Sequence, residues 1–199
     1  MKHLIFAAIF AGSLLSGSEN VLFSFPGDKF GKGPGLTLKN DTLVFAPVSR
    51  MYVDRKFDPA GGRLFIQARF APAAPENRDE KIQHYFWSAR GNNRTVASGI
   101  FLEQNGAFMA HFYVFDTSKK AISCAANIKL PADKSITLEY IWTTSGISIK
   151  VNGLLVAKKN YSGTLQAGTQ IMVGTALKNR PLIPMTIEKL QLFSPESAQ

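Results

Sequence analysis

The clearest local pattern in the chain is the pair Asn152-Gly153, which lies between two short runs of alternating apolar and polar residues. Asn-Gly favours a two-residue type I′ turn, because both central positions need a positive φ that Gly adopts freely and Asn more easily than most residues. Stepping outward by twos collects one apolar face, made of Ile147, Ile149, Val151, Leu154 and Val156. The pattern predicts a β-hairpin with this face over a core and with Leu155 as the apolar exception on the other face.

Alternating runs of strand length fill most of the remaining chain. Two of them are GGRLFIQARF at 61–70 and GAFMAHFYVF at 106–115, and clusters of Gly, Asn, Asp, Ser or Pro separate the runs. The segment 71–81 contains two prolines and no helical period, so we expect an exposed loop there. The spacing predicts an all-β protein, an antiparallel sandwich.

The same alternation suggests a binding face. If the plainly apolar sides of 61–70 and 106–115 point to the core, their opposite sides combine aromatic and polar residues. Rings that stack on sugar faces beside groups that bind hydroxyls suit a glycan groove. The candidate ligand-binding residues are Gln67, Arg69, Tyr85, Trp87, His111 and Tyr113. In 82–89 the outward pair is either Tyr85 and Trp87 or His84 and Phe86, and the alternative to a groove is that the rings pack under the loop 71–81.

The first residues and the overall charge narrow the class of protein. Residues 1–18 have a basic start, an apolar run from Leu4 to Leu15 and small residues after it, so we expect a secretory signal peptide followed by one domain over 19–199. The protein is then secreted, to the extracellular space or the periplasm. The apolar run is too short to span a membrane, and no later segment is long enough.

The formal net charge of +9 favours anionic partners such as acidic polysaccharides, lipopolysaccharide or phospholipid headgroups. Export and the scattered lysines and arginines argue against nucleic acid. Cys124 is the only cysteine, so no intramolecular disulfide forms, and its apolar surroundings predict a buried structural thiol.

The order of the segments resembles the concanavalin A-like lectin/glucanase superfamily, and within it the laminin-G-like branch. The segments ITLEYIW, ISIKVNGLLVA, YSGTL, QIMVG, NRPLIP and MTIEKLQLF follow one another as in that family, and the resemblance covers about residues 20 to 194. It implies a jelly-roll sandwich of two antiparallel sheets, one of them concave. It also makes Asn152 and Gly153 scaffold residues and not a site.

This superfamily includes hydrolases, lyases, lectins and adhesion modules, so residues must decide the function. The paired catalytic glutamates of the family's glucanases, in Glu-x-Asp-x-x-Glu, are absent. The nearest carboxylate cluster, Glu76, Asp79 and Glu80, falls in the Pro-containing loop. Gln83-His84 only partly resembles the family's alginate-lyase pattern. We therefore expect no catalytic residues.

The resemblance also bears on metals and function. Many laminin-G-like domains bind calcium, for which Asp58 or Asp116 are candidate ligands, with turn formation as the alternative; the three histidines share no metal-ligand spacing. We expect no cofactor.

The function that the sequence favours is a secreted, non-catalytic carbohydrate-binding or adhesion-type module whose partner is a polysaccharide or glycan, with anionic glycans favoured by the charge. The alternatives are a divergent glycoside hydrolase or polysaccharide lyase, and a structural envelope protein without a small ligand. The oligomeric state does not follow from the sequence.

Overall fold

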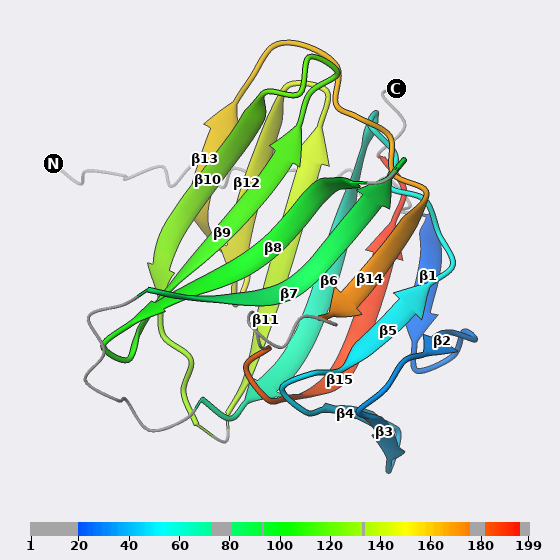
Figure 1. Ribbon diagram of the computed structural model, residues 1–199, viewed down its shortest axis with the longest axis vertical. Coiled ribbons are helices and arrows are strands. Elements are labelled where there is room, and N and C mark those ends of the chain that lie inside the picture. The colour runs from blue at the N-terminus through cyan, green and yellow to red at the C-terminus, as the bar shows by residue number, and fades with distance from the viewer. Residues whose placement is uncertain (1–19, 73–80, 93, 133, 176–181, 196–199) are drawn as a thin grey trace, which may run out of the picture.

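Two antiparallel sheets packed face to face contain all fifteen strands of the computed structural model, which describes residues 20–72, 81–92, 94–132, 134–175 and 182–195 (Figure 1). The predicted all-β jelly-roll sandwich is confirmed. The expected signal peptide at 1–18 lies outside the described residues. No helix in the described part of the chain is long and apolar enough to cross a membrane.

In the eight-stranded sheet, seven strands lie side by side, and the eighth, β1 (Val21–Phe25), pairs with β15. The order is β13 (Leu154–Asn160), β12 (Gly146–Val151), β11 (Ser135–Thr143), β6 (Gly61–Phe70), β15 (Met185–Phe193), β4 (Thr42–Phe45) and β3 (Leu36–Lys39).

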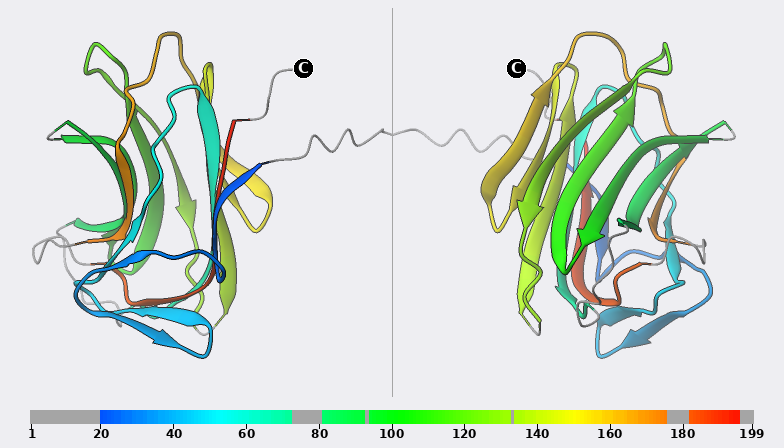
Figure 2. Two further views of the ribbon diagram at one scale, coloured as in Figure 1. Left: turned by 90° about the vertical axis from the view of Figure 1, so that its right-hand side faces the viewer. Right: turned by 60° about the vertical axis from the view of Figure 1, so that its left-hand side comes forward.

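The seven-stranded sheet lies opposite, and Figure 2 shows it bowed so that its outer face is concave. Its order is β10 (Ala121–Ile128), β9 (Ala107–Phe115), β8 (Arg94–Gln104), β7 (Ile82–Gly91), β14 (Gln170–Gly174), β5 (Arg50–Val53) and β2 (Gly31–Lys32).

The core fills the space between the sheets, as the alternation predicted for two central strands. The buried apolar side chains of β6 are Leu64, Ile66, Ala68 and Phe70, and those of β9 are Phe108, Ala110, Phe112 and Val114. Two-residue periodicity places the intervening side chains of each strand on the outer face of its own sheet. Since β6 and β9 belong to different sheets, the two mixed faces point in opposite directions.

The predicted hairpin forms, with one change of register. Asn152 and Gly153 have φ values of 49° and 78° and join β12 to β13, as a type I′ turn requires. Beyond the turn, Lys150 pairs with Leu155 but Ile149 pairs with Ala157, so Val156 is an extra residue, a β-bulge. The expectation that Val156 shares the core face is therefore wrong: Val156 is 38% exposed, and Ala157 packs against the core instead. The expectation is also wrong for Leu154, which is 72% exposed at the tip of the hairpin.

A second bulge explains why neither expected orientation of 82–89 is right. Tyr85 pairs with Ile100 and Trp87 pairs with Gly99, which leaves Phe86 as the extra residue of β7. Phe86 and Trp87 are both fully buried, because the bulge turns two consecutive side chains inward. Strict alternation resumes after it, with Ser88 outward and Ala89 inward.

Candidate functional site

The concave face of the seven-stranded sheet gathers three of the predicted ring-bearing residues. Tyr85 on β7, Ile100 on β8 and His111 on β9 are paired across adjacent strands in one row. In the next row, the same strands align Ser88, Ser98 and Tyr113. Because strands lie about 4.8 Å apart, the rings of β7 and β9 stand on either side of β8, about 10 Å apart at the backbone.

We call this arrangement the aromatic trough: Tyr85, His111 and Tyr113 form its sides, and Ser88, Ser98 and Ile100 form its floor. The three floor residues are buried although they belong to an outer face. The larger rings flank these three residues on the neighbouring strands. The face thus places aromatic rings at the sides and the hydroxyl-bearing Ser88 and Ser98 between them.

His111 and Tyr113 form one unit on β9. Their rings are stacked, with centroids 5.4 Å apart and planes at 8°, and the Tyr113 hydroxyl lies 3.0 Å from His111 Nδ1. On its other side, His111 Nε2 lies 3.0 Å from the sulfur of Met109. These contacts hold the two rings parallel as one stacked pair on the concave face.

The surroundings of both rings favour their uncharged forms. Partial burial lowers the pKa of His111 from 6.5, and the positive charge of Lys81 lowers it further. Partial burial also raises the pKa of Tyr113 above 10, and the neighbouring Tyr85 adds to this.

The trough continues at one end into a cavity of about 310 Å³. Its lining includes Leu102, Met109 and Asn127, which align in one outward row of β8, β9 and β10, together with Lys81. Lys81 therefore places a positive charge in the cavity and also lowers the pKa of His111.

Three of the six predicted binding residues lie elsewhere. Trp87 is in the core, where it packs against Phe112 and Tyr140 with ring centroids 5.6 and 5.4 Å away. Gln67 and Arg69 are on the outer face of the eight-stranded sheet, where both side chains bind the carboxylate of Glu188, at 2.9 and 2.8 Å. The expectation of one groove lined by Arg69, His111 and Tyr113 is therefore wrong, because the residues belong to different sheets.

The concave face carries no carboxylate at any outward position of the described strands. Glu103 is the only Asp or Glu in the seven strands of this sheet. It pairs in register with the buried Phe108 on the inner side, and its Oε2 lies 2.6 Å from Nε2 of the buried His84. The candidate cluster Glu76, Asp79 and Glu80 lies outside the described residues.

Asp58 and Asp116, the candidate calcium ligands, both stabilise their own turns. The Asp58 carboxylate accepts a hydrogen bond from the backbone N–H of Ala60 at 2.8 Å. That of Asp116 accepts from the Ser118 hydroxyl and the Lys120 N–H, at 2.6 and 2.8 Å, and these two bonds lower its pKa. No three His, Cys, Asp or Glu side chains cluster within the described ranges.

Sequence reasoning missed the floor of the trough. Ser88 is outward only because the bulge at Phe86 shifts the alternation, and no residue type in 82–89 announces that shift. Ser98 and Ile100 point outward from β8 because they pair with Ser88 and Tyr85 of β7. The sequence alone does not show which residues of β7 and β8 are paired.

By sequence, neither a family model nor a curated protein matches this chain. Solved structures do match in fold. The botulinum neurotoxin type G receptor binding domain has a TM-score of 0.63 at 10% identity, with 89% of this chain covering 48% of that one, so this chain spans about half its length.

Two further structures cover nearly whole chains. The non-specific endo-β-1,3(4)-glucanase SCLam from family GH16 has a TM-score of 0.56 at 8% identity, with 88% of this chain and 91% of that one covered. The carbohydrate recognition domain of Emp46p has a TM-score of 0.54 at 10% identity, with 83% and 87% covered. The fold is thus the concanavalin A-like jelly roll, which binding domains and glucanases share. At these identities the likeness shows the fold alone.

Proposed function

We propose that this protein is a secreted, non-catalytic glycan-binding module, and that the aromatic trough is its binding surface. The observation that carries the proposal is the trough itself, with stacked rings above buried serines on a concave face. Planar rings pack on the apolar faces of sugars, while hydroxyl groups and backbone carbonyls bind the sugar hydroxyls. We also propose that the chain belongs to the laminin-G-like branch, which the order of its segments supports. The pattern of residues 1–18 supports its export.

The charges near the trough favour an acidic glycan. Lys81 lines the cavity together with Met109, and its positive charge lowers the pKa of His111. Arg90 occupies an exposed outward position two residues beyond Ser88 on β7. The outward positions of the described strands contribute no opposing carboxylate. A uronate or sulfate group would therefore meet a positive potential along the trough.

The absence of outward carboxylates from the described strands supports binding over hydrolysis. Glycoside hydrolases use two carboxyl groups that flank the scissile bond. The sheet supplies only Glu103, which is bound to His84 on the inner side. The names of the similar structures agree in part, since they include a receptor binding domain, a carbohydrate recognition domain and a glucanase.

Tyr113→Ala tests the proposal. A glycan array and a panel of acidic and neutral polysaccharides should first identify a ligand. The substitution should then weaken its binding about fivefold, the equivalent of about 1 kcal/mol of lost stacking, as measured by isothermal titration calorimetry. Tyr113→Phe should retain most of the affinity, because the ring stays.

Arg69→Ala is the matched control, since Arg69 lies on the opposite sheet and should not affect binding. If Arg69→Ala weakens binding and Tyr113→Ala does not, the ligand site is not the trough. If the native protein binds no glycan on the array or in the panel, the result would favour a structural envelope protein without a small ligand.

A lyase is the second candidate, favoured by the hydrogen-bond distance between Tyr113 and His111. Elimination of a uronate needs a base and a group that neutralises the carboxylate, not two carboxyl groups. Neutral His111 can accept a proton from the Tyr113 hydroxyl as that hydroxyl takes the C5 proton of the uronate. The C4–O4 bond then breaks as the C4–C5 double bond forms, and the departing O4 oxygen takes a proton from solvent. The test is the ultraviolet absorbance of an unsaturated product during incubation with acidic polysaccharides, which a binding module does not generate.

A further inference from the structure

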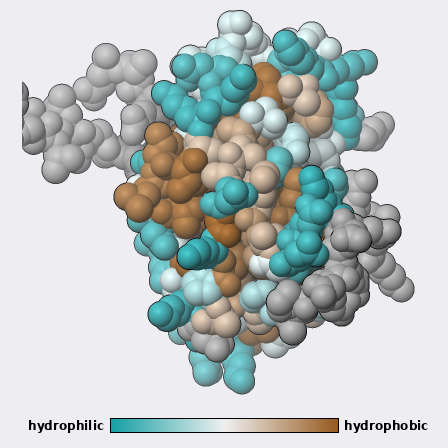
Figure 3. Space-filling model, turned by 90° about the vertical axis from the view of Figure 1, so that its left-hand side faces the viewer, coloured by the Kyte–Doolittle hydropathy of each residue, from teal (hydrophilic) through white to brown (hydrophobic). Residues whose placement is uncertain are grey.

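The tip of the β12–β13 hairpin exposes three consecutive large apolar side chains. Leu154 is 72% exposed, Leu155 57% and Val156 38%. Single exposed apolar residues are ordinary on protein surfaces, but a contiguous group usually marks a contact site. Figure 3 views the molecule from the side of β10, β12 and β13 and shows a raised hydrophobic cluster at the edge of the surface.

This exposure follows from the geometry of the hairpin. The type I′ turn sends Leu154 and Leu155 to opposite faces at the tip, and the bulge turns Val156 out of the core face. Leu154 pairs with Val151, which packs against the core, yet Leu154 itself reaches past the body of the sandwich. The tip therefore exposes apolar side chains on both faces of the hairpin, and not as a stripe along one face of the strand.

The edge of β13 is poorly suited to pairing with another strand. β13 is the terminal strand of its sheet in the described part of the chain. A bulge and exposed lysines, here Lys158 and Lys159, are features that protect natural edges from strand addition. A partner is therefore expected to contact this edge through the apolar side chains of the tip and not by adding a strand.

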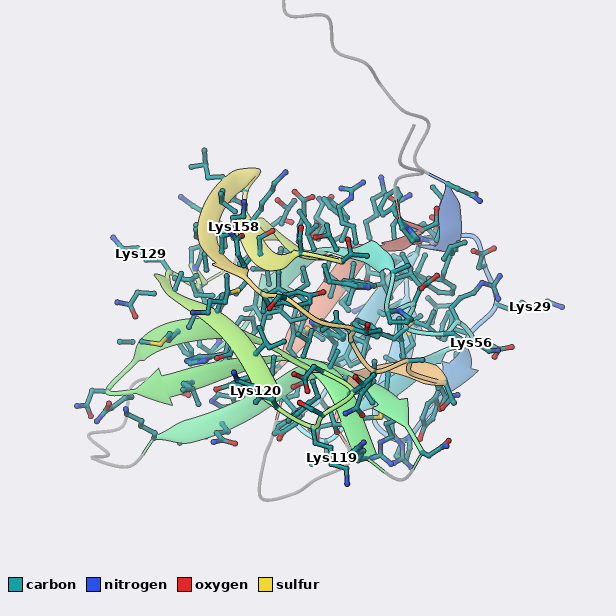
Figure 4. All side chains as sticks on the ribbon, turned by 90° about the horizontal axis from the view of Figure 1, so that it is seen from above. Lys29, Lys56, Lys119, Lys120, Lys129 and Lys158 are labelled. Atoms are coloured by element: carbon teal, nitrogen blue, oxygen red, sulfur yellow. The ribbon has the colours of Figure 1, made fainter. Side chains whose placement is uncertain are left out.

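The hairpin itself carries only positive charge, and Glu139, which pairs with its Lys150 from β11, has its carboxylate bound to Arg63 at 2.9 Å. Lys150, Lys158 and Lys159 belong to the hairpin, and no Asp or Glu occurs between Glu139 and Glu188. Figure 4 shows Lys158 and Lys129 on the same flank of the molecule, away from Lys29 and Lys56. Two copies meeting through this tip would bring lysines together without acids, so the charge favours a partner that is itself anionic.

We propose that the hairpin tip docks the protein onto an anionic lipid bilayer. Leu154, Leu155 and Val156 enter the interface between headgroups and acyl chains, and the lysines lie at the level of the anionic headgroups, with their alkyl stems along the apolar side chains. The hairpin belongs to the eight-stranded sheet and the trough to the outer face of the other, so lipid contact leaves the trough accessible.

Vesicle sedimentation tests the proposal with phosphatidylcholine vesicles that either contain or lack phosphatidylglycerol. The native chain should bind the anionic vesicles at least about tenfold more tightly, less so at high salt. Leu154→Ser with Leu155→Ser should lower that affinity about tenfold or more, because the apolar contact is lost. Lys158→Gln with Lys159→Gln should remove most of the salt dependence.

Leu38→Ser is the matched control. Leu38 is 48% exposed on β3, at the opposite end of the same sheet, so its replacement should not change vesicle binding. Unchanged thermal midpoints should show that all variants are folded, as expected for exposed positions.

Leu155→Trp reports insertion directly, since Trp87 and Trp142 are both buried. Its emission should shift to the blue and be quenched by brominated lipids. The proposal is overturned if Leu154→Ser with Leu155→Ser sediments as the native chain does, if the native chain ignores anionic vesicles, or if light scattering shows a dimer that the double variant dissociates without any lipid binding.

Discussion

At the turn Asn152-Gly153, the types of two residues determine the local backbone conformation. Both residues have positive φ, and a Cβ added at Gly153 would meet no heavy atom within 4 Å. The requirement for Gly there is therefore one of backbone conformation and not of space. Asn152 adds a tertiary contact, because its side-chain oxygen accepts a hydrogen bond from the N–H of Thr137 at 2.9 Å.

Replacement of Gly153 by Val should lower the thermal midpoint. A β-branched residue at positive φ is strained by about 1 to 3 kcal/mol. Differential scanning calorimetry measures the change, with Gly163→Val as a comparison at another open position of positive φ outside a hairpin turn. A native midpoint in Gly153→Val would contradict the type I′ assignment.

The thiol of Cys124 should be unreactive in the native state. The side chain is buried, as its sequence context predicted, and burial raises its pKa to about 11. At pH 8 the thiolate, which is the nucleophile, is then scarce. Titration with a chromogenic disulfide should be slow in buffer and rapid in denaturant; rapid reaction of the folded protein would place Cys124 at the surface.

At the level of elements, the pairing of β7 with β8 determines both the core and the trough. The bulge at Phe86 turns two large rings inward. Phe86 packs against Phe101 at a centroid distance of 5.1 Å, while Trp87 lies over Gly99. Gly99 makes this possible, since a Cβ there would lie 2.2 Å from Trp87 Nε1.

Gly99→Ala should therefore destabilise the sandwich, even though alanine favours strands no less than glycine does. The methyl group would force the Trp87 indole away from its site, at a cost of about 1 to 3 kcal/mol for overpacking. Urea denaturation followed by tryptophan fluorescence measures the loss. Gly146→Ala is the control, because the nearest atom to its added Cβ is 3.3 Å away; equal losses in the two variants would count against this packing.

At the level of the whole molecule, burial and not cross-linking holds the sandwich together. The inner faces of both sheets merge into one hydrophobic cluster, and the chain has a single cysteine. A reducing agent should therefore leave the thermal midpoint unchanged. A midpoint that falls on reduction would reveal a disulfide between two chains, with Cys124→Ser as the variant that confirms it.

Much of this architecture could be predicted from the sequence, because alternation reports burial directly. Leu64, Ile66, Ala68 and Phe70 were assigned inward from their spacing alone, and the Asn152-Gly153 turn from its residue types. Both depend on neighbours along the chain, which the sequence contains.

The candidate site was predicted only in part, because it depends on which strands share a sheet. Tyr85, His111 and Tyr113 do lie together, but alternation could not tell that Arg69 points away from them on another sheet. Nor does any residue type mark a bulge, so Trp87 was assigned to the surface and is buried. Long-range pairing, and not local preference, decides both points.

The bulge in β7 also bears on how such a chain changes over generations. An extra residue inside a strand acts as an insertion that the sheet absorbs without losing its pairing beyond that point. Trp87, Ser88 and Ala89 are displaced by one position relative to an unbulged β7, until Val96, an extra residue of β8, restores the register at Arg90. Everything after Val156 in β13 is displaced in the same way. Two chains with the same sheets can thus differ by single-residue gaps within strands. An alignment of their sequences without such gaps is wrong beyond the bulge, although the two backbones still superimpose.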